Sequence, residues 1–339
     1  MGIKISRIIP FAIIAVFILT AGVIFAVVRD YQSSQNISLA DIEIEEEPEP
    51  EEYIPSRAEL IMTALVQAYP KKIEKAEFRN DDWAVLMSGT WYYYAGGAML
   101  PEELLEKAEN YTGSFGLTSY LRELPPWTEP SPEQAERYRQ RYNPGNSNAN
   151  SSNSNTNSGG DRNAVQRQRT YHFRDSLWRA GSREESSRRV VTIDFLGKRL
   201  PIHSDLSGVI SLVEERIIAA AKIDSAVQSW ITNIGEVHGW NWRNVANSQS
   251  RSNHSYGIAI DILPKSLNGK ETYWQWAAQN GKEWWNVPYE ERYHPPDAVI
   301  KAFEAYGFMW GGKWSLYDTM HFEYRPEVFI LSGIELTQY

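Results

Sequence analysis

The sequence predicts an α+β fold, and three stretches of the chain carry that prediction. Residues 190–196 are rich in β-branched side chains, which favours a short strand. From about residue 206 to residue 234, apolar residues recur at helical spacing and predict a long amphipathic helix. Ile258, Ile260 and Ile262 alternate with other residues, as in a half-buried strand. Short strands and turns dominate from there to the C-terminus, so this part is expected to mix both kinds of element.

The first thirty residues predict a membrane anchor. Lys4 and Arg7 precede an apolar run over residues 8–28, which is long enough to span a bilayer as a helix. Positive charge on that side favours a cytoplasmic N-terminus. A cleaved signal peptide is the alternative, because small residues lie near the end of the run. We therefore expect a single-pass protein of the cell membrane, with a cytoplasmic tip and anchor over residues 1–30 and an extracytoplasmic C-terminal domain.

Four further segments follow along the chain. Residues 31–52 are acidic and contain prolines, so they predict an extended stalk. Residues 53–142 are expected to be mainly helical, because residues 57–69 carry apolar side chains at helical spacing. Residues 143–162 are dominated by Asn and Ser and predict a flexible linker, or a long loop within one domain. Residues 163–339 then form the predicted α+β domain.

Composition excludes several classes of function. The formal net charge of −9 argues against nucleic acid as a partner, because phosphate binding requires basic patches. The chain has no cysteine, which excludes disulfides, lipid attachment through cysteine and thiolate metal sites. Any transition metal must therefore be held by histidines and carboxylates.

Two short stretches contain the residues that predict chemistry. His254, Asp261 and His321 form a catalytic zinc set of three protein ligands, with a fourth position left for water. His254 and Asp261 are seven residues apart, so they would face opposite sides of one straight strand. A helix would place them on one face, but the alternating isoleucines favour a strand. We expect His254 before a turn at residues 256–257 and Asp261 on the strand that follows.

The second stretch surrounds His321. Apolar residues alternate with His321 and Glu323, which predicts a half-buried strand with these two side chains on the same face. Glu323 is therefore placed to orient the histidine from outside the ligand set. Asp318 falls on the other face of a continuous strand, so we expect it in the preceding turn. There it could take a proton from a water that zinc acidifies and pass that proton to a leaving amine.

These residues carry a resemblance to a known family. The pattern Ser-x-His-x-x-Gly-x-Ala-x-Asp, completed by Asp-x-x-His-Phe-Glu after Trp-Gly-Gly-Lys-Trp, resembles the D-alanyl-D-alanine carboxypeptidase and L-alanyl-D-glutamate endopeptidase family over about residues 240–327. The resemblance implies a hedgehog-like zinc peptidase domain with a small antiparallel sheet and flanking helices. It also implies roles for four residues: zinc ligation by His254, Asp261 and His321, and base catalysis by Asp318. Glu323 and Ser252 are predicted to support the ligands from outside the ligand set.

Some features of the family leave alternatives open. Some members carry Glu where Asp318 stands, so the match is nearer to the endolysin-like branch than to the vancomycin-resistance dipeptidases. Members also use an arginine near the scissile bond or the substrate carboxylate. Arg243 and Arg251 are both candidates for that role. We prefer Arg243, because Trp242 could hold it in a packed wall.

The sequence thus predicts a zinc-dependent peptidoglycan peptidase that hydrolyses an amide bond next to a D-amino acid in the stem peptide. We expect a D-alanyl-D-alanine carboxypeptidase that binds Zn²⁺. The alternatives are an L-alanyl-D-glutamate-type endopeptidase, and a non-catalytic wall-binding protein on a degenerate peptidase fold. The expected partners are peptidoglycan stem peptides and, through the N-terminal helix, the cytoplasmic membrane.

Overall fold

The structure, a computed structural model of the chain, describes residues 53–113, 119–142, 167–246 and 248–338. The predicted anchor, the acidic stalk and the Asn/Ser-rich segment lie outside these residues. Within the part of the chain that is described, no helix has both the length and the apolar character needed to cross a bilayer. The described residues from Pro55 onward form one compact unit.

A four-stranded antiparallel sheet occupies the middle of residues 53–142, so the prediction that this region is mainly helical is wrong there. The strands follow in sheet order: β1 (Lys75–Arg79), β2 (Asp82–Met87), β3 (Thr90–Tyr93) and β4 (Leu100–Pro101). Asn80 and Asp81 have φ of 49° and 60°, and Ser88 and Gly89 have φ of 51° and 77°. Positive φ at both central residues makes the two-residue turn that matches hairpin twist. These two residue pairs therefore fold the stretch into hairpins.

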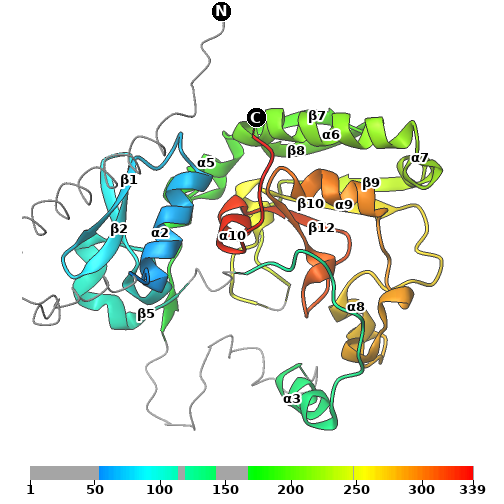
Figure 1. Cartoon of the computed structure of the whole chain (residues 1–339), viewed down its shortest axis with the longest axis horizontal. Helices are drawn as coiled ribbons and strands as arrows, with labels where there is room; N and C mark the ends of the chain where they lie inside the picture. Colours follow the sequence, from blue (N-terminus) through cyan, green and yellow to red (C-terminus); the bar gives the residue numbers. More distant parts are fainter. Residues whose placement is uncertain (1–52, 114–118, 143–166, 247, 339) are drawn as a thin grey trace, which may run out of the picture. The chain divides into compact units, whose positions relative to one another are not determined.

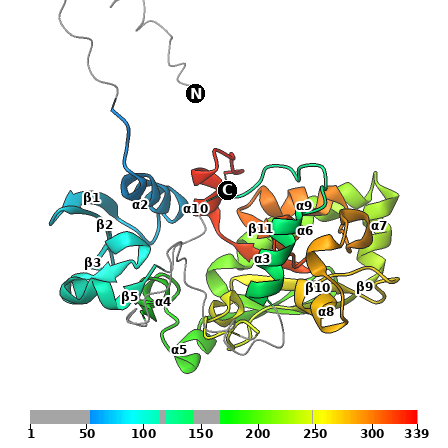
Figure 2. The same ribbon diagram turned by 90° about the horizontal axis from the view of Figure 1, so that it is seen from below.

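Helix α2 (Arg57–Ala68) confirms the helix predicted for residues 57–69. It begins at Ser56, whose hydroxyl accepts a hydrogen bond from the Glu59 amide at 3.1 Å. Its buried face includes Ile61 and Leu65, both fully enclosed. The helix lies against the C-terminal helix α10 (Pro326–Leu331) in both views of the ribbon (Figures 1 and 2). The region has three further helical segments: two 3-10 helices, η2 (Ala95–Gly97) and η3 (Glu102–Asn110), and helix α3 (Pro132–Tyr142).

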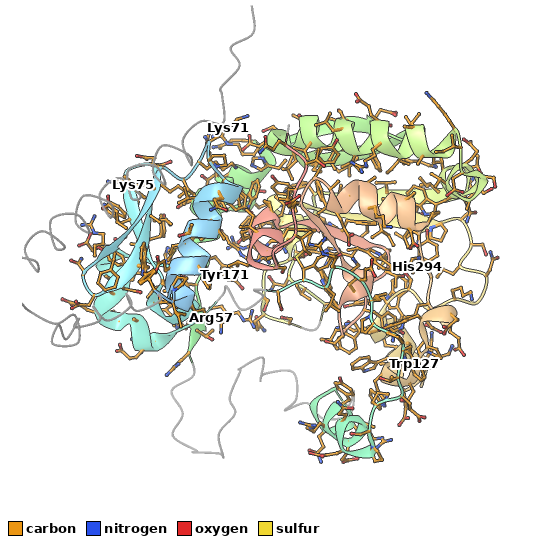
Figure 3. All side chains as sticks on the ribbon, viewed as in Figure 1. Arg57, Lys71, Lys75, Trp127, Tyr171 and His294 are labelled. Atoms are coloured by element: carbon orange, nitrogen blue, oxygen red, sulfur yellow. The ribbon has the colours of Figure 1, made fainter. Side chains whose placement is uncertain are left out.

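Helix α3 packs against residues that lie far from it in the sequence. The Tyr138 ring lies 5.1 Å from the Trp284 ring, and Arg139 Nε donates to Glu283 Oε1 at 2.9 Å. These partners follow helix α8 (Trp274–Gln279) in the C-terminal part of the chain. Figure 3 shows helix α3, with its side chains, close to the segment that contains α8. The N-terminal region therefore contacts the α+β domain through α2, through α3 and through residues between them, such as Tyr120, whose hydroxyl donates to Glu304 Oε1 at 2.5 Å.

The α+β domain is built on a second four-stranded antiparallel sheet of order β11-β12-β10-β9. Its elements in chain order are α4 (His172–Trp178), α5 (Arg183–Ser187), β7 (Val190–Phe195), β8 (Lys198–His203), α6 (Ser207–Ala221), α7 (Ser225–Thr232), β9 (Ile234–His238), β10 (Ala259–Pro264), α9 (Asp297–Glu304), β11 (Phe308–Trp310) and β12 (His321–Tyr324). Strand β7 confirms the strand predicted over residues 190–196 and pairs with β8 as a hairpin.

The single long helix predicted over residues 206–234 is in fact two helices. Helix α6 ends at Ala221, and α7 begins after Asp224. The Asp224 carboxylate accepts a hydrogen bond from the Ala226 amide at 2.8 Å, which is the geometry of a helix N-cap. Apolar periodicity runs through both helices, so periodicity alone did not reveal the break.

The two faces of the second sheet differ in character. Ile260 and Phe322 are fully buried on one face, and the Phe303 ring of α9 stacks on Phe322 at 4.0 Å. Helices α6 and α9 contribute to this hydrophobic core, which extends as far as α2 (Figure 1). Asp261 lies between Ile260 and Ile262 along β10, so its side chain points to the opposite face. The expected α+β arrangement of small antiparallel sheets and helices is therefore present.

Candidate metal centre

The fold brings the three predicted metal ligands together from three places in the chain. Asp261 on β10 and His321 on β12 are directly paired across the antiparallel ladder. His254 lies in a short 3-10 helix, η6 (Asn253–Tyr256), which Gly257 ends with φ of 70°. A Cβ at Gly257 would lie 2.8 Å from the His203 amide nitrogen, so this turn requires glycine. The expected order of histidine, turn and strand is confirmed.

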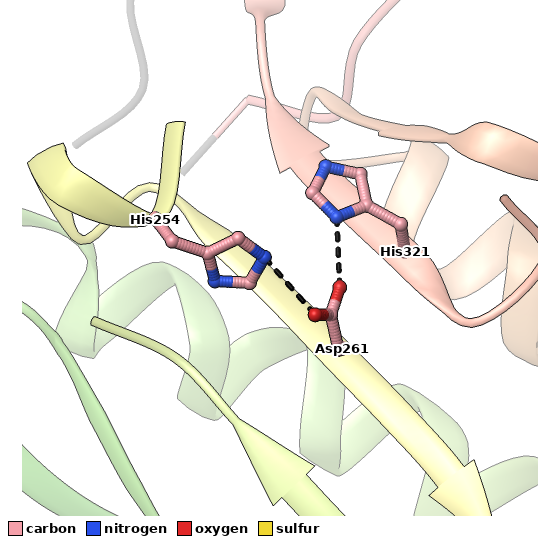
Figure 4. Close-up of side chains that lie close together, drawn as sticks. All are labelled: His254, Asp261 and His321. Carbon is pink, nitrogen blue, oxygen red and sulfur yellow. Dashed lines mark hydrogen bonds and ion pairs between the residues drawn. The ribbon is translucent and has the colours of Figure 1, made fainter. Parts of the chain in front are cut away.

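The ligand atoms of the three residues converge on one point. One ligand atom from each of His254, Asp261 and His321 lies within 4.8 Å of the other two, and all three residues are buried. His254 Nε2 lies 3.2 Å from Asp261 Oδ2, and His321 Nδ1 lies 2.8 Å from Asp261 Oδ1 (Figure 4). Among the described residues this is the one group of three or more His, Asp or Glu side chains with such geometry.

The outer nitrogen of each histidine has its own hydrogen-bond acceptor. His254 Nδ1 lies 2.6 Å from the Gly239 carbonyl oxygen, and a carbonyl only accepts, so this nitrogen carries the proton. His321 Nε2 lies 3.2 Å from Glu323 Oε2, which selects the proton on Nε2. In the neutral rings, His254 Nε2 and His321 Nδ1 are therefore left with lone pairs. Both lone pairs face the Asp261 carboxylate.

A buried carboxylate between two imidazole nitrogens needs positive charge beside it, which protons on the rings or a bound cation can supply. Burial lowers the pKa of His321, but its hydrogen bonds with Asp261 and Glu323 raise it further, so without a metal the ring holds both protons and a bound ion would replace the proton on Nδ1. His254 Nε2 is enclosed and forms no hydrogen bond with any described residue. Burial raises the pKa of Asp261, but the two histidines beside it lower it further, so the carboxyl stays ionised. Two imidazole nitrogens and one carboxylate oxygen match the donor set of a catalytic zinc site. The residues present therefore fit zinc, which they would hold through His254 Nε2, His321 Nδ1 and Asp261.

Asp318 lies in the turn before β12, as expected. The His321 amide donates to the Asp318 carbonyl at 3.2 Å, and Asp318 forms a backbone bridge with Tyr273. The carboxylate oxygen Oδ1 is enclosed and has no hydrogen-bond partner in the described part of the chain. Burial, only partly offset by the charge on His321, raises the pKa of Asp318 to about 7. An enclosed carboxyl group with that pKa can both accept and donate a proton near neutral pH.

The two candidate arginines lie in different surroundings. Arg243 Nη2 is 4.0 Å from Asp261 Oδ2, and its side chain is 40% exposed. Arg251 Nη1 is paired with Asp175 and also donates to the Ala180 carbonyl at 3.2 Å. The Trp242 ring, which we expected to support Arg243, instead lies 4.8 Å from the Arg251 guanidinium. The structure therefore brings Arg243 to the metal ligands and ties Arg251 to the protein.

Two residues of the sequence pattern hold the ligands in place. The Ser252 hydroxyl accepts a hydrogen bond from the His254 amide at 3.3 Å and so caps the short helix that carries this ligand. Glu323 is buried on the same face as His321. Burial raises the pKa of Glu323, but the contacts with His321, with Arg325 and with Asn253 lower it to about 2. Glu323 is therefore a permanent acceptor for the His321 N–H.

Sequence reasoning did not identify three residues around the centre. The Gly239 carbonyl holds His254, and a Cβ at this glycine would lie 1.9 Å from the Pro201 carbonyl oxygen. Asn253 donates through Nδ2 to Glu323 Oε2 at 2.6 Å. Tyr273 bridges to Asp318 through its backbone. Only Asn253 carried a usable signal, because it directly precedes a predicted ligand.

Comparison with known families gives two matches. Residues 246–324 match the family described as D-alanyl-D-alanine carboxypeptidase, so the resemblance found in the sequence is confirmed. This segment contains all three predicted metal ligands, Asp318 and Glu323, whereas Arg243 precedes it. Residues 61–114 match a family described only as a domain of unknown function. No solved structure matches the chain, so the hedgehog-like fold stays a prediction.

Proposed function

We propose that the segment matched by the D-alanyl-D-alanine carboxypeptidase family is a working zinc peptidase that hydrolyses an amide bond next to a D-amino acid in the peptidoglycan stem peptide. One observation carries this proposal. The Gly239 carbonyl and Glu323 take the outer protons of the two histidines, so two lone pairs and the Asp261 carboxylate meet at one point. Asp318, with an enclosed and unpartnered carboxylate oxygen, supplies the proton-transfer group that a structural metal site does not need.

The residues support a hydrolysis in which one proton is carried by one carboxylate. Bound zinc would polarise the scissile carbonyl and acidify a water molecule. Asp318 accepts the proton of that water at a carboxylate oxygen, and the hydroxide adds to the carbonyl carbon. Asp318 then donates the proton to the leaving amine as the C–N bond breaks. With zinc bound, His254 and His321 would serve as neutral ligands and Asp261 would carry one negative charge, so the centre would keep the positive charge that stabilises the transition state.

Arg243 supports a substrate that carries a carboxylate close to the scissile bond. Its guanidinium borders the predicted metal ligands, its side chain is 40% exposed, and its contacts with the described residues are long, at 4.0 Å to Asp261 and 3.4 Å to the Asn244 carbonyl. A guanidinium in this state can pair with the terminal carboxylate of a D-Ala-D-Ala peptide. An L-Ala-D-Glu substrate can offer a carboxylate as well, because glutamate has two carboxyl groups and the amide to the next residue uses only one of them. The products of cleavage, and not Arg243, therefore distinguish the two activities.

The proposed location follows from the sequence of the N-terminus. The apolar run over residues 8–28 behind Lys4 and Arg7 supports an uncleaved anchor with the peptidase domain on the outer side of the cytoplasmic membrane. Alkaline carbonate extraction of membranes, followed by protease treatment of intact spheroplasts, tests this location. A protein released by carbonate, or protected from the protease, contradicts it.

The enzymatic proposal is tested with the full chain, zinc and purified muropeptides, followed by mass spectrometry. Asp318→Asn is the companion variant, because it keeps the shape of the side chain and removes its proton-accepting charge. The expected result is loss of a terminal D-Ala by the wild type, with no cleavage by Asp318→Asn at unchanged zinc content. A cut between L-Ala and D-Glu makes the protein an endopeptidase. No cleavage by folded, zinc-loaded wild type across varied muropeptides supports the wall-binding alternative.

A further inference from the structure

A chain of buried polar contacts runs from the metal ligand His321 to helix α2. Glu323, which holds His321, has its second oxygen Oε1 at 3.7 Å from Arg325 Nη1. Arg325 Nε is paired with Glu327 Oε1. The other oxygen of Glu327, Oε2, accepts a hydrogen bond from the Tyr69 hydroxyl at 2.7 Å. Four links therefore connect a metal ligand near the C-terminus to the end of the first described helix.

Every member of this chain is enclosed. Tyr69 is 6% exposed, Glu323 is 7%, Arg325 is 5% and Glu327 is 1%. Buried ion pairs of this kind seldom add net stability, because removing the charges from water costs as much as their attraction returns. Such a network can instead hold its side chains in one geometry. The geometry fixed here is that of Glu323, since its two oxygens serve His321 and Arg325.

Tyr69 occupies the outer end of this network and lies in a different part of the sequence from the ligands. It is the residue at which α2 ends. Its ring packs edge-on against Trp178 at 5.8 Å and against Tyr324 at 6.4 Å, next to the strand that carries His321. Residues 61–114 match a family without assigned function, and this contact gives that region a physical connection to the metal centre.

We propose that Tyr69 is a positioning residue for the metal centre, acting through Glu327, Arg325 and Glu323 on His321, so that the region that begins with α2 completes the zinc site. The inference rests on the zinc site of the proposed function. The Tyr69 hydroxyl orients the Glu327 carboxylate, which fixes Arg325, and Arg325 holds Glu323 in the orientation that receives the His321 proton. Loss of the hydroxyl leaves Glu327 Oε2 without this donor and allows the side chains of Glu327, Arg325 and Glu323 to shift.

The test compares two tyrosine hydroxyls of the same region in the full chain. Tyr69→Phe removes the hydroxyl that donates to Glu327. Tyr92→Phe removes the hydroxyl of a similarly buried tyrosine, which is hydrogen-bonded to Ser176, a residue outside this network. Zinc affinity is measured by competition with a chromogenic chelator. The unfolding temperature of the metal-free protein is measured separately. Direct outer partners of ligands change metal affinity by about 10- to 100-fold, so a more distant residue is expected to change it by about three- to tenfold.

The expected result is weaker zinc binding by Tyr69→Phe and unchanged binding by Tyr92→Phe. Glu327→Gln, which keeps an acceptor for Tyr69 but removes the charge that holds Arg325, should weaken binding at least as much as Tyr69→Phe. Equal zinc affinity of Tyr69→Phe and wild type overturns the inference, as does an equal loss in both tyrosine variants. A wild type that binds no zinc overturns the proposed function together with this inference. A wild type that binds zinc but cleaves nothing overturns the proposed function alone.

Discussion

Replacing Glu323 with glutamine removes the charge that accepts the His321 proton while leaving the shape of the side chain unchanged. Glu323 Oε2 accepts from His321 Nε2 at 3.2 Å and from Asn253 Nδ2 at 2.6 Å. Glutamine has one accepting oxygen. If that oxygen keeps both bonds, the amide NH₂ faces the guanidinium of Arg325, and two donors then oppose each other. The variant therefore loses either the hydrogen bond that accepts the His321 proton or the ion pair with Arg325.

The structure sets the size of this effect. The pKa of Glu323 is about 2 instead of 4.5, which corresponds to about 3 kcal/mol in favour of the carboxylate. Only the share that acts through His321 reaches the metal, and a hydrogen bond to a charged group is worth about 1.5–3 kcal/mol. We therefore expect Glu323→Gln to weaken zinc binding by about 10- to 100-fold, as is usual for the outer partner of a ligand.

The matched control is Glu236→Gln. Glu236 Oε2 lies 2.9 Å from His238 Nε2, with the same two-residue spacing on a strand, but the pair is exposed and lies outside the ligand set. Zinc dissociation constants of both variants are measured by chelator competition against the wild type. A change of less than about twofold in Glu323→Gln, or the same change in both variants, refutes the reasoning about the His321 proton.

Three further predictions address the other residues of the site. The pKa of Asp318 is raised in the folded protein, so the contribution of this group to metal-free stability is lost as the pH rises toward about 7. Urea unfolding in the presence of a chelator should therefore show that the free energy of unfolding falls less between pH 5 and pH 8 in Asp318→Asn than in the wild type. Arg243→Gln should raise KM for a D-Ala-D-Ala peptide by about tenfold and leave the free energy of unfolding unchanged. Arg251→Gln should instead lower the free energy of unfolding by about 2 kcal/mol. Steady-state kinetics measures the first effect and urea titration the second. Ser252→Ala should cost about 1 kcal/mol of unfolding free energy, measured in urea, because it removes the cap of the helix that carries His254.

The N-terminal region shows where sequence patterns were insufficient. Helical spacing correctly predicted α2, but the following hairpins depend on two pairs of turn residues with positive φ, Asn80-Asp81 and Ser88-Gly89. Neither pair is the Asn-Gly sequence that most strongly signals such a turn. Strands β1 and β2, which flank the first turn, are short, and their burial does not alternate from residue to residue. The sequence pattern therefore did not reveal these strands, and the stretch was wrongly predicted to be mainly helical.

The ligand set shows how much the sequence alone determined. His254, Asp261 and His321, the turn at Gly257 and the place of Asp318 all followed from residue type and spacing, because strand alternation fixes which side chains share a face. Tertiary structure decided what spacing cannot express: the pairing of Asp261 with His321, the carbonyl of Gly239 on His254, and the row of contacts from Glu323 to Tyr69. These contacts join residues up to 258 positions apart. They depend on how separate elements pack, and no local pattern in the sequence records that.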